Sequence, residues 1–195
     1  FLNAEVFGFL GLNAFDVFPI FAGAIYLAGE EESHSLDQLL ANPVSRKQVL
    51  LQKAGALLTG LFALSIALWI GIIGGSTIAG FGLSLIGTTQ AIFSLYVLGI
   101  TLGLVALAIG ASTGKKSLAG GFAASVAIIG FLLDTFLSVV DALDPLRFIS
   151  VFYYFNGNDV IINGINPVHC IAMVCTAAIA LVIAIWQFEK RDLAN

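Results

Sequence analysis

Two neighbouring acids, Glu31 and Glu32, are the first residues whose chemistry needs an explanation. Paired carboxylates on a helix could form an intramembrane glutamic protease, but such a centre also needs an arginine and histidines held within the membrane. Position 36 is Leu, and the nearest histidine, His34, lies in the same polar stretch. The HExxH motif of zinc peptidases is absent from the sequence. We therefore expect no catalytic residue, no metal site and no enzymatic activity in this chain.

A second candidate is the segment GASTGKKS at residues 110–117, which superficially resembles a phosphate-binding loop. The Walker A pattern places four residues between its glycines, whereas three separate Gly110 from Gly114. A phosphate loop also follows a β-strand, and this segment joins two apolar stretches. We interpret it as a tight turn and expect no nucleotide or other cofactor in this chain.

A third candidate is an acid within an apolar stretch, Asp134, with Ser138 and Asp141 on the same helical face at i, i+4 and i+7. A carboxylate at membrane depth costs several kcal/mol unless it meets water or a partner. Asp134 and Ser138 therefore indicate either a translocation pathway or a helix that ends at the outer membrane interface. Cys170 and Cys175 lie in another apolar stretch, where they point in different directions and act as small packing residues.

The composition of the whole chain is that of a membrane protein. Hydrophobic residues make up 59% of its 195 residues, charged residues only 10%, and the mean hydropathy is +1.02. A soluble domain has roughly 25% charged residues. We predict an all-α polytopic helical bundle forming one transmembrane domain over residues 1–195. Stretches near 20 apolar residues give five spans: 10–29, 54–75, 89–111, 118–141 and 166–187.

Basic residues predict the orientation of these spans, because cytoplasmic loops are enriched in Lys and Arg. Arg46, Lys47, Lys53, Lys115, Lys116, Lys190 and Arg191 fall on one side and Arg147 on the other. The loop 30–53 and the C-terminus are thus expected in the cytoplasm, and the segment 142–165 outside. Because five spans would leave Phe1 outside, we expect a missing upstream span and a native protein of six spans.

Two further patterns concern packing and the outer surface. Gly99 and Gly103 form a GxxxG pair, and Ala119, Ala123 and Ala127 form a similar row, which allow close helix contacts within the bundle or across a dimer. The outer segment contains Phe152, Tyr153 and Tyr154, between a start signal at Asp144-Pro145 and a stop at Asn156-Gly157. We predict a short helix at the outer interface, either part of a gate or an ordinary aromatic anchor.

The loop GEEESHSLDQLLANPVSRKQVLLQK (29–53) is too structured for a passive connector. Leu36, Leu39 and Leu40 recur at i, i+3 and i+4, which predicts a short amphipathic helix over 31–41. Glu30, Glu31 and Glu32 are expected at its start, where negative charge suits the helix dipole. Asn42 would then cap the next helix, with Pro43 at its first position.

This loop resembles that of the membrane subunits of ABC-type exporters in the type-2 permease superfamily. The shared signature is an acidic run, a leucine pair, Pro-Val-Ser-Arg and a later lysine, here Glu30 to Lys53. The resemblance implies a coupling helix that docks on a separate ATP-binding subunit, with ATP and Mg²⁺ held by that partner. The implied coupling residues are Glu30, Glu31, Glu32, Leu36, Leu39, Leu40, Pro43, Arg46 and Lys53.

The same resemblance implies two permease copies, identical or related, which form a pathway in the plasma membrane and an external gate in the segment 145–157. The implied pathway and gate residues are Asp134, Ser138, Phe152, Tyr153 and Tyr154. Membrane lipid is an expected partner and nucleic acid is not. Two other functions stay open: an ion-coupled transporter or channel that uses Asp134, and a membrane scaffold for a larger assembly.

Overall fold

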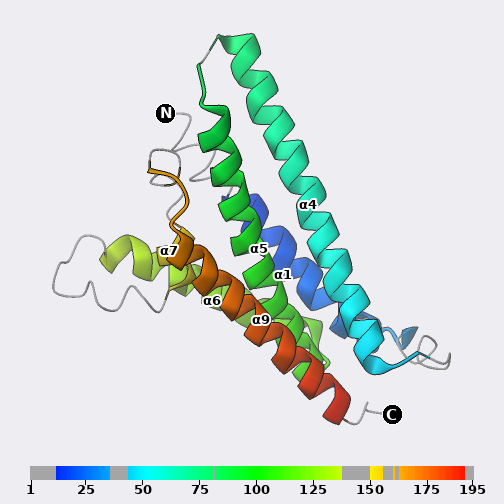
Figure 1. The fold of residues 1–195 in the computed structure, drawn as a ribbon. Helices are drawn as coiled ribbons and strands as arrows, with labels where there is room; N and C mark the ends of the chain where they lie inside the picture. Colours follow the sequence, from blue (N-terminus) through cyan, green and yellow to red (C-terminus); the bar gives the residue numbers. More distant parts are fainter. Residues whose placement is uncertain are drawn as a thin grey trace.

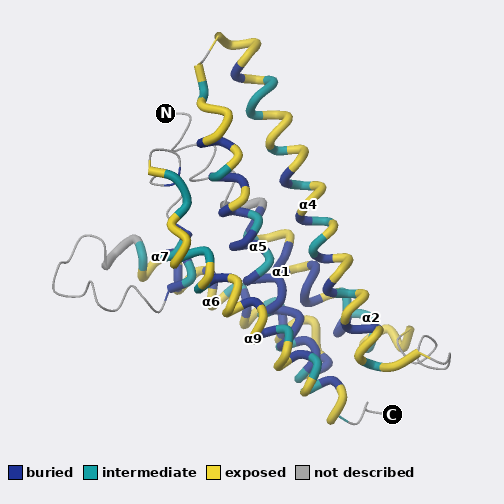
Figure 2. The backbone as a smooth tube through the Cα atoms, in the orientation of Figure 1, coloured by how far each residue is buried: buried dark blue, intermediate teal, exposed yellow. Residues whose placement is uncertain are grey.

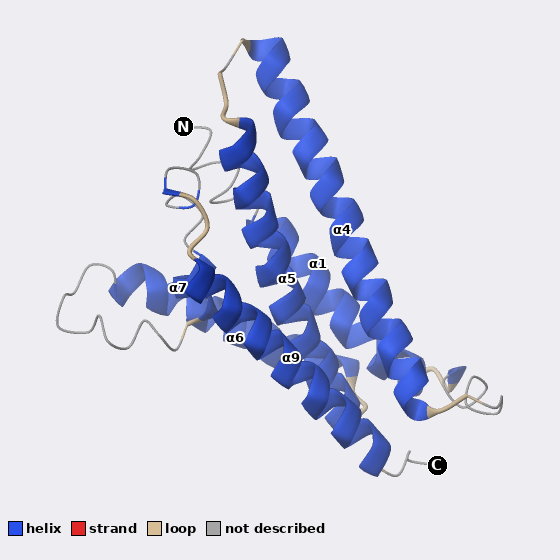
Figure 3. Ribbon diagram, in the orientation of Figure 1, coloured by secondary structure: helices blue, strands red, loops and turns tan. Residues whose placement is uncertain are grey.

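The computed structural model describes residues 12–35, 44–80, 82–137, 150–155, 160 and 163–191, without the side chains of 12–14 and 135–137. Every regular element in these ranges is a helix (Figure 3). The four long helices are α4 (Arg46–Ala79), α5 (Leu85–Thr113), α6 (Lys116–Leu137) and α9 (Pro167–Lys190). Each is long and apolar enough to cross a membrane. The chain is therefore an all-α, polytopic membrane bundle, as the sequence predicts.

The long helices extend beyond the predicted spans, most clearly at the start of α4. Ser45 caps this helix: its Oγ accepts a hydrogen bond from the Gln48 amide (3.2 Å), and its own amide donates to Gln48 Oε1 (3.0 Å). This reciprocal pair is a capping box, which satisfies two backbone donors at once. The prediction that Asn42 caps the helix with Pro43 at its first position is therefore wrong, because the helix begins at Arg46.

The first predicted span is a helix of mixed character. The elements α1 (Leu12–Ala24), η2 (Ile25–Gly29, a π-helical turn) and α2 (Glu30–Glu32) follow one another without a break. Their junction residues all keep right-handed helical backbone angles. Glu30 to Glu32 therefore end this helix, and the prediction that they begin a new one is wrong. The chain leaves the helix at His34, where φ is 56°. Most of the predicted helix 31–41 lies outside the described residues.

Helix α5 forms the centre of the bundle. Its most apolar window is 72% buried, against 17–22% for the other three long helices. It packs on α1, α9, α6 and α4, which surround it (Figures 1 and 2). The outer helices turn many large apolar side chains away from the protein, as expected where lipid rather than water is the solvent.

Glycines let α1 approach the central helix closely. A Cβ atom on Gly23 would lie only 2.2 Å from the carbonyl oxygen of Gly103, and one on Gly103 would lie 3.0 Å from Pro19 Cβ of α1 and 2.7 Å from Leu57 Cδ2 of α4. Gly99 faces Leu61 and the Phe15 carbonyl in the same way. The GxxxG pair therefore packs inside the bundle. The alanine row of α6 is buried as well, at Ala119, Ala123 and Ala127.

The short helix α7 (Val151–Phe155) closes one end of the bundle, where it packs on α5, α6 and α9. Phe152 and Phe155 are buried, and the Ser150 hydroxyl donates to the Gly130 carbonyl of α6 (2.8 Å). A helix is thus present where the sequence predicts one, although its predicted start and stop signals lie outside the described residues. We call this the aromatic end, formed by α7 and His169. The opposite, charged end contains α2, the start of α4 and the end of α9 (Figure 1).

Candidate functional site

The three consecutive glutamates at the charged end each bind a different helix. Glu30 pairs with a lysine of α4, Glu31 with the arginine that follows α9, and Glu32 with the first residue of α6. We call this set the glutamate clamp, and its members are Glu30, Glu31, Glu32, Lys53, Arg191 and Lys116. The clamp thereby joins the ends of four helices that are far apart in sequence.

Helix geometry explains how three neighbours reach three partners. With 3.6 residues per turn, consecutive side chains point about 100° apart, so three in a row cover most of the circumference of the helix. Negative charge at a helix C-terminus is also unfavourable for the helix dipole. The cationic partners therefore offset a cost that the EEE run would otherwise impose on the end of α2.

The pair of Glu31 and Arg191 lies deepest in the clamp. Their side chains are only 16% and 19% exposed, and Arg191 Nη1 also donates to the Ala111 carbonyl of α5 (3.0 Å). Because water screens this pair little, its interaction is stronger than that of a surface ion pair. It fixes the end of α9 against both α2 and α5.

Glu32 stabilises the start of α6 in addition to its ion pair. One carboxylate oxygen accepts a hydrogen bond from the Lys116 amide (2.8 Å), and the other lies 3.3 Å from Lys116 Nζ. The amide is one of the donors that a helix start leaves unpaired, so Glu32 acts as a cap from another helix. The two side chains are 32% and 56% exposed, and such a pair contributes about 0–1 kcal/mol.

Arg46 attaches the C-terminal end of the loop 33–45 to Arg191. As the first residue of α4, it donates from Nη1 to the carbonyl of Phe188 (3.3 Å) and to the carbonyl of Arg191. Glu31 precedes the loop 33–45 and Arg46 follows it. Both ends of the loop are therefore attached to Arg191, one through its side chain and the other through its backbone.

The structure thus brings together five of the predicted coupling residues: Glu30, Glu31, Glu32, Arg46 and Lys53. The remaining four, Leu36, Leu39, Leu40 and Pro43, lie outside the described residues. Sequence reasoning missed Arg191 as a site residue and used it only to orient the chain. One signal could have identified it. The basic pair Lys190-Arg191 directly follows the last predicted span, and the acidic run Glu30 to Glu32 follows the first predicted span on the same side of the membrane.

Asp134 lies at the far end of α6, away from the clamp, and its side chain is half-buried. Ser138 lies outside the described residues, as does Asp141, so the predicted face of three polar side chains is not described. Whether Asp134 belongs to a pathway or to the outer interface stays open.

The aromatic end joins α7 to α9 through three rings. His169 lies 5.4 Å from the ring of Tyr153 and 5.4 Å from that of Tyr154, and the two tyrosine rings are 5.2 Å apart. Phe152 makes an edge contact with Phe131 of α6 at 5.8 Å. The predicted gate residues therefore lie together at one end of the bundle.

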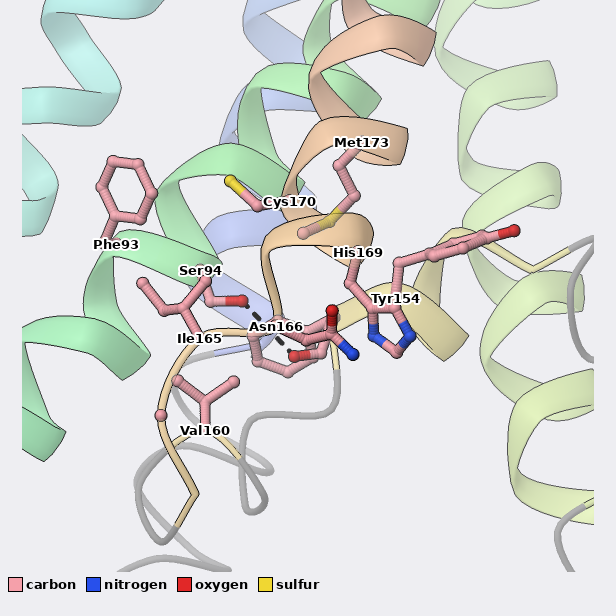
Figure 4. Close-up of a pocket in the computed structure, with 11 residues that line it drawn as sticks. Phe93, Ser94, Tyr154, Val160, Ile165, Asn166, His169, Cys170 and Met173 are labelled. Atoms are coloured by element: carbon pink, nitrogen blue, oxygen red, sulfur yellow. Dashed lines mark hydrogen bonds between the residues drawn. The ribbon is translucent and has the colours of Figure 1, made fainter.

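Next to these rings is a small cavity of about 20 Å³, whose lining includes His169, Cys170 and Met173 (Figure 4). The Ser94 hydroxyl donates across it to the Phe155 carbonyl (3.4 Å). A space of this size holds about one water molecule, so it is a packing defect rather than a substrate site. Cys170 and Cys175 are both free thiols.

A larger groove of about 250 Å³ lies between α4 and α5. Its polar side chains already bond within the protein: Trp69 Nε1 donates to Thr89 Oγ1 (3.0 Å), Ser65 Oγ to the Leu61 carbonyl (2.8 Å), and Tyr96 to the Leu58 carbonyl (3.4 Å). The remaining wall is apolar, from residues such as Phe62 and Ile92. The groove therefore offers only hydrocarbon contacts.

The described residues provide no arrangement suited to catalysis. Residues 110–114 match the G-x-S-x-G spacing of a nucleophile elbow, but that motif needs a strand-to-helix turn. Here Gly110 to Thr113 form the end of α5, and the Ser112 hydroxyl donates to the Ile109 carbonyl (2.9 Å). Within the described ranges, no three His, Cys, Asp or Glu side chains gather as metal ligands would.

Comparison with known proteins identifies the class. The family model described as ABC-2 family transporter protein matches residues 8–193, almost the whole chain. The chain belongs to this family and is a permease subunit of an ABC transporter, with multiple membrane spans. Permeases of this family are transport subunits that generally work with an ATP-binding subunit. Neither a curated protein nor a solved structure matches the chain in the corresponding searches.

Proposed function

We propose that the chain couples ATP hydrolysis by a separate ABC-type ATP-binding subunit to the export of a substrate across the plasma membrane. The observation that carries the proposal is the loop 33–45, which is held at both ends by Glu31 and Arg46 on one residue, Arg191. Because both ends of the loop are attached to the bundle, a partner that displaces the loop also displaces the helices. A flexible loop without these attachments would absorb the displacement. In this proposal ATP and Mg²⁺ belong to the partner.

The orientation follows the distribution of basic residues. We place the charged end, with the C-terminus, in the cytoplasm, where the ATP-binding subunit is present. The aromatic end then lies outside, with Phe152, Tyr153 and Tyr154 as the external gate and Asp134 near it. A second permease, identical or related, completes the pathway.

The leucines of the loop provide the contact with the ATP-binding subunit in this proposal. Changing Leu39→Asp and Leu40→Asp together replaces an apolar docking face by charge, which should abolish binding of the ATP-binding subunit while the permease still folds. The measurement is co-purification of the two subunits from membranes, together with size-exclusion chromatography of the permease. Leu118→Asp is the matched control, because Leu118 is an exposed leucine (52%) at the same end but outside the loop.

Retention of the ATP-binding subunit by the double variant would contradict the proposed docking. Transport that runs without ATP, driven instead by membrane potential or pH, would favour the ion-coupled alternative.

A further inference from the structure

We propose that Arg191 is the joint through which displacement of the loop 33–45 reaches α9, and that α9 carries this displacement to α7 at the aromatic end. The inference rests on the proposed function, since it names the path by which the partner's work would cross the membrane. It concerns a positioning role: Arg191 touches neither nucleotide nor substrate.

The first step is the geometry at the charged end. Arg191 holds the Glu31 carboxylate with its guanidinium and receives Arg46 on its backbone carbonyl. Lys53 and Lys116, in contrast, each bind one glutamate on one side of the loop only. Movement of either end of the loop therefore acts on Arg191, and through it on α9, which does not adjoin the loop in sequence. The loop acts on α4 directly, because Arg46 begins that helix, and on α6 through the one ion pair of Lys116.

The burial of these contacts supports the same ranking. The side chains of Glu31 and Arg191 are the least exposed of the three pairs, at 16% and 19%, while those of Lys116 and Glu32 are 56% and 32% exposed. The planar guanidinium also forms several directed hydrogen bonds at once, unlike the ammonium of lysine. Among the three ion pairs of the clamp, that of Arg191 is therefore the least exposed to water and the richest in directed hydrogen bonds.

The second step is the stiffness of α9. Its sequence PVHCIAMVCTAAIALVIAIWQFEK has no glycine, and its one proline, Pro167, is at the first turn where it does not disturb the helix. Helix kinks arise at internal proline, glycine or π turns, and α9 has none of these. By contrast, Pro19 and a π turn interrupt the helix that begins with α1. With 24 residues at 1.5 Å each, α9 is a straight rod of about 36 Å.

The third step is how α9 contacts its neighbours. It buries one face, on the residues Met173, Ala177, Ala180, Ala184 and Phe188, and turns the rest of its surface outward. Three of the five are alanines, which let α9 pack closely on its neighbours, and the larger Met173 and Phe188 are buried toward its two ends. Between its two ends, α9 is joined to α5 by a hydrogen bond from Thr101 Oγ1 to the Met173 carbonyl (3.3 Å). Because α9 has no internal kink, a displacement of one of its ends moves the helix as a unit instead of bending it.

The last step is the aromatic end. His169, in the first turn of α9, packs against both Tyr153 and Tyr154 of α7. A displacement of the rod changes this contact directly. Two specific contacts, the Arg191 joint and the His169 ring contact, thus occupy the two ends of one stiff helix, and the loop and the predicted gate are connected through it.

The experiment uses a native reporter. Cys170 lines the small cavity beside His169, and Cys175→Ala leaves it as the single thiol of this chain. The permease and its ATP-binding subunit are reconstituted together, and the labelling rate of Cys170 by a membrane-impermeant maleimide is measured with and without ATP and vanadate. The test variant is Arg191→Gln. Lys190→Gln is the matched control, because it removes the same charge one residue earlier, where the side chain lies over Trp186 instead of the loop.

We expect ATP to change the labelling rate in the parent and in Lys190→Gln, and Arg191→Gln to reduce this change on the order of fivefold or more, the lower range of typical coupling between sites. The response is expressed in each variant as the ratio of the labelling rates with and without ATP, so that a changed resting position of α9 does not count as lost coupling. A merely structural role would change the rate without ATP and leave this ratio at the parent value. ATP hydrolysis and binding of the ATP-binding subunit should persist. An ATP response in Arg191→Gln equal to that of the parent overturns the inference.

Two further results separate the inference from the function it rests on. If the parent protein does not bind an ATP-binding subunit, or shows no ATP response at Cys170, the proposed function fails first. If Arg191→Gln does not fold, the exchange Glu31→Arg with Arg191→Glu restores an ion pair of opposite direction. Recovery of the ATP response in this double exchange supports the joint, and a folded double exchange without the response overturns it.

Discussion

Gly114 shows how one residue controls the clamp. It ends α5 with φ at 67°, a backbone conformation that strains any residue with a Cβ atom. A Cβ atom there would lie 2.6 Å from Glu31 Oε1 and 2.7 Å from Arg191 Nη2. Gly114 is therefore needed twice, first for the turn between α5 and α6 and second for the space that the buried ion pair occupies.

Comparison with Gly80 separates these two needs. Gly80 ends α4 with φ at 73°, but a Cβ atom there would meet nothing within 4 Å. We expect Gly80→Ala to cost about 1–2 kcal/mol of folding free energy, the typical cost of a left-handed conformation. Gly114→Ala should cost at least about 2 kcal/mol more, because it also displaces a largely buried ion pair. Thermal unfolding in detergent measures both, and equal losses would mean that the clamp does not depend on Gly114.

At the scale of the elements, the crossing of α1 and α5 determines how the first helix enters the bundle. The backbones approach so closely that a methyl group on Gly23 would collide with the carbonyl oxygen of Gly103. Small residues at such crossings let helices in membranes gain van der Waals contact along their backbones. This crossing places Glu30 to Glu32 where their three partners lie.

Gly23→Ala should therefore disturb both the crossing and the clamp. A Cβ atom 2.2 Å from a carbonyl oxygen forces the backbones apart, at a cost of about 1–3 kcal/mol or more. Gly71→Ala is the matched control on α4, where the added methyl group meets nothing within 4 Å. It should be neutral or stabilising by up to about 1 kcal/mol, through helix propensity. A loss of thermal stability in Gly71→Ala as large as in Gly23→Ala would contradict this reason.

The elements also show what sequence can and cannot predict. Apolar length identified the four long helices and the helical outer segment, because the cost of burying backbone in lipid leaves few other structures. The start of α4 was misplaced at Asn42, although Ser45 and Gln48 carry a capping-box signature. The glutamates were assigned to a helix start because negative charge favours that position. The structure places them at a helix end, because α2 continues from the preceding π turn, which no periodicity reveals. Arg191 was missed because its partners lie 160 and 145 residues away.

At the scale of the whole molecule, the bundle has two chemically different ends. The clamp gathers charges at one end, while the rings of α7 and His169 lie together away from it, as Figure 4 shows for Tyr154 and His169. Such polarity gives the molecule a direction across the membrane, and the proposed orientation places the more basic end in the cytoplasm.

This direction can be measured with two cysteines in a variant that lacks Cys170 and Cys175. Lys115→Cys lies in the exposed turn between α5 and α6 at the charged end, and Gly82→Cys lies in the exposed connection between α4 and α5 at the opposite end. In intact cells, an impermeant maleimide should label Cys at position 82 and leave position 115 unlabelled until the membrane is opened. The reverse pattern would invert the proposed orientation.

The ion pair of Glu31 and Arg191 also affects how the molecule is made. The two residues are separated by 160 positions. Glu31 can therefore pair with Arg191 only after nearly all of this chain has been synthesised. Until then, Glu31 remains hydrated at the membrane surface. Closure of this pair thus follows the synthesis of α9, and it distinguishes a bundle in which α9 has docked from one in which it has not.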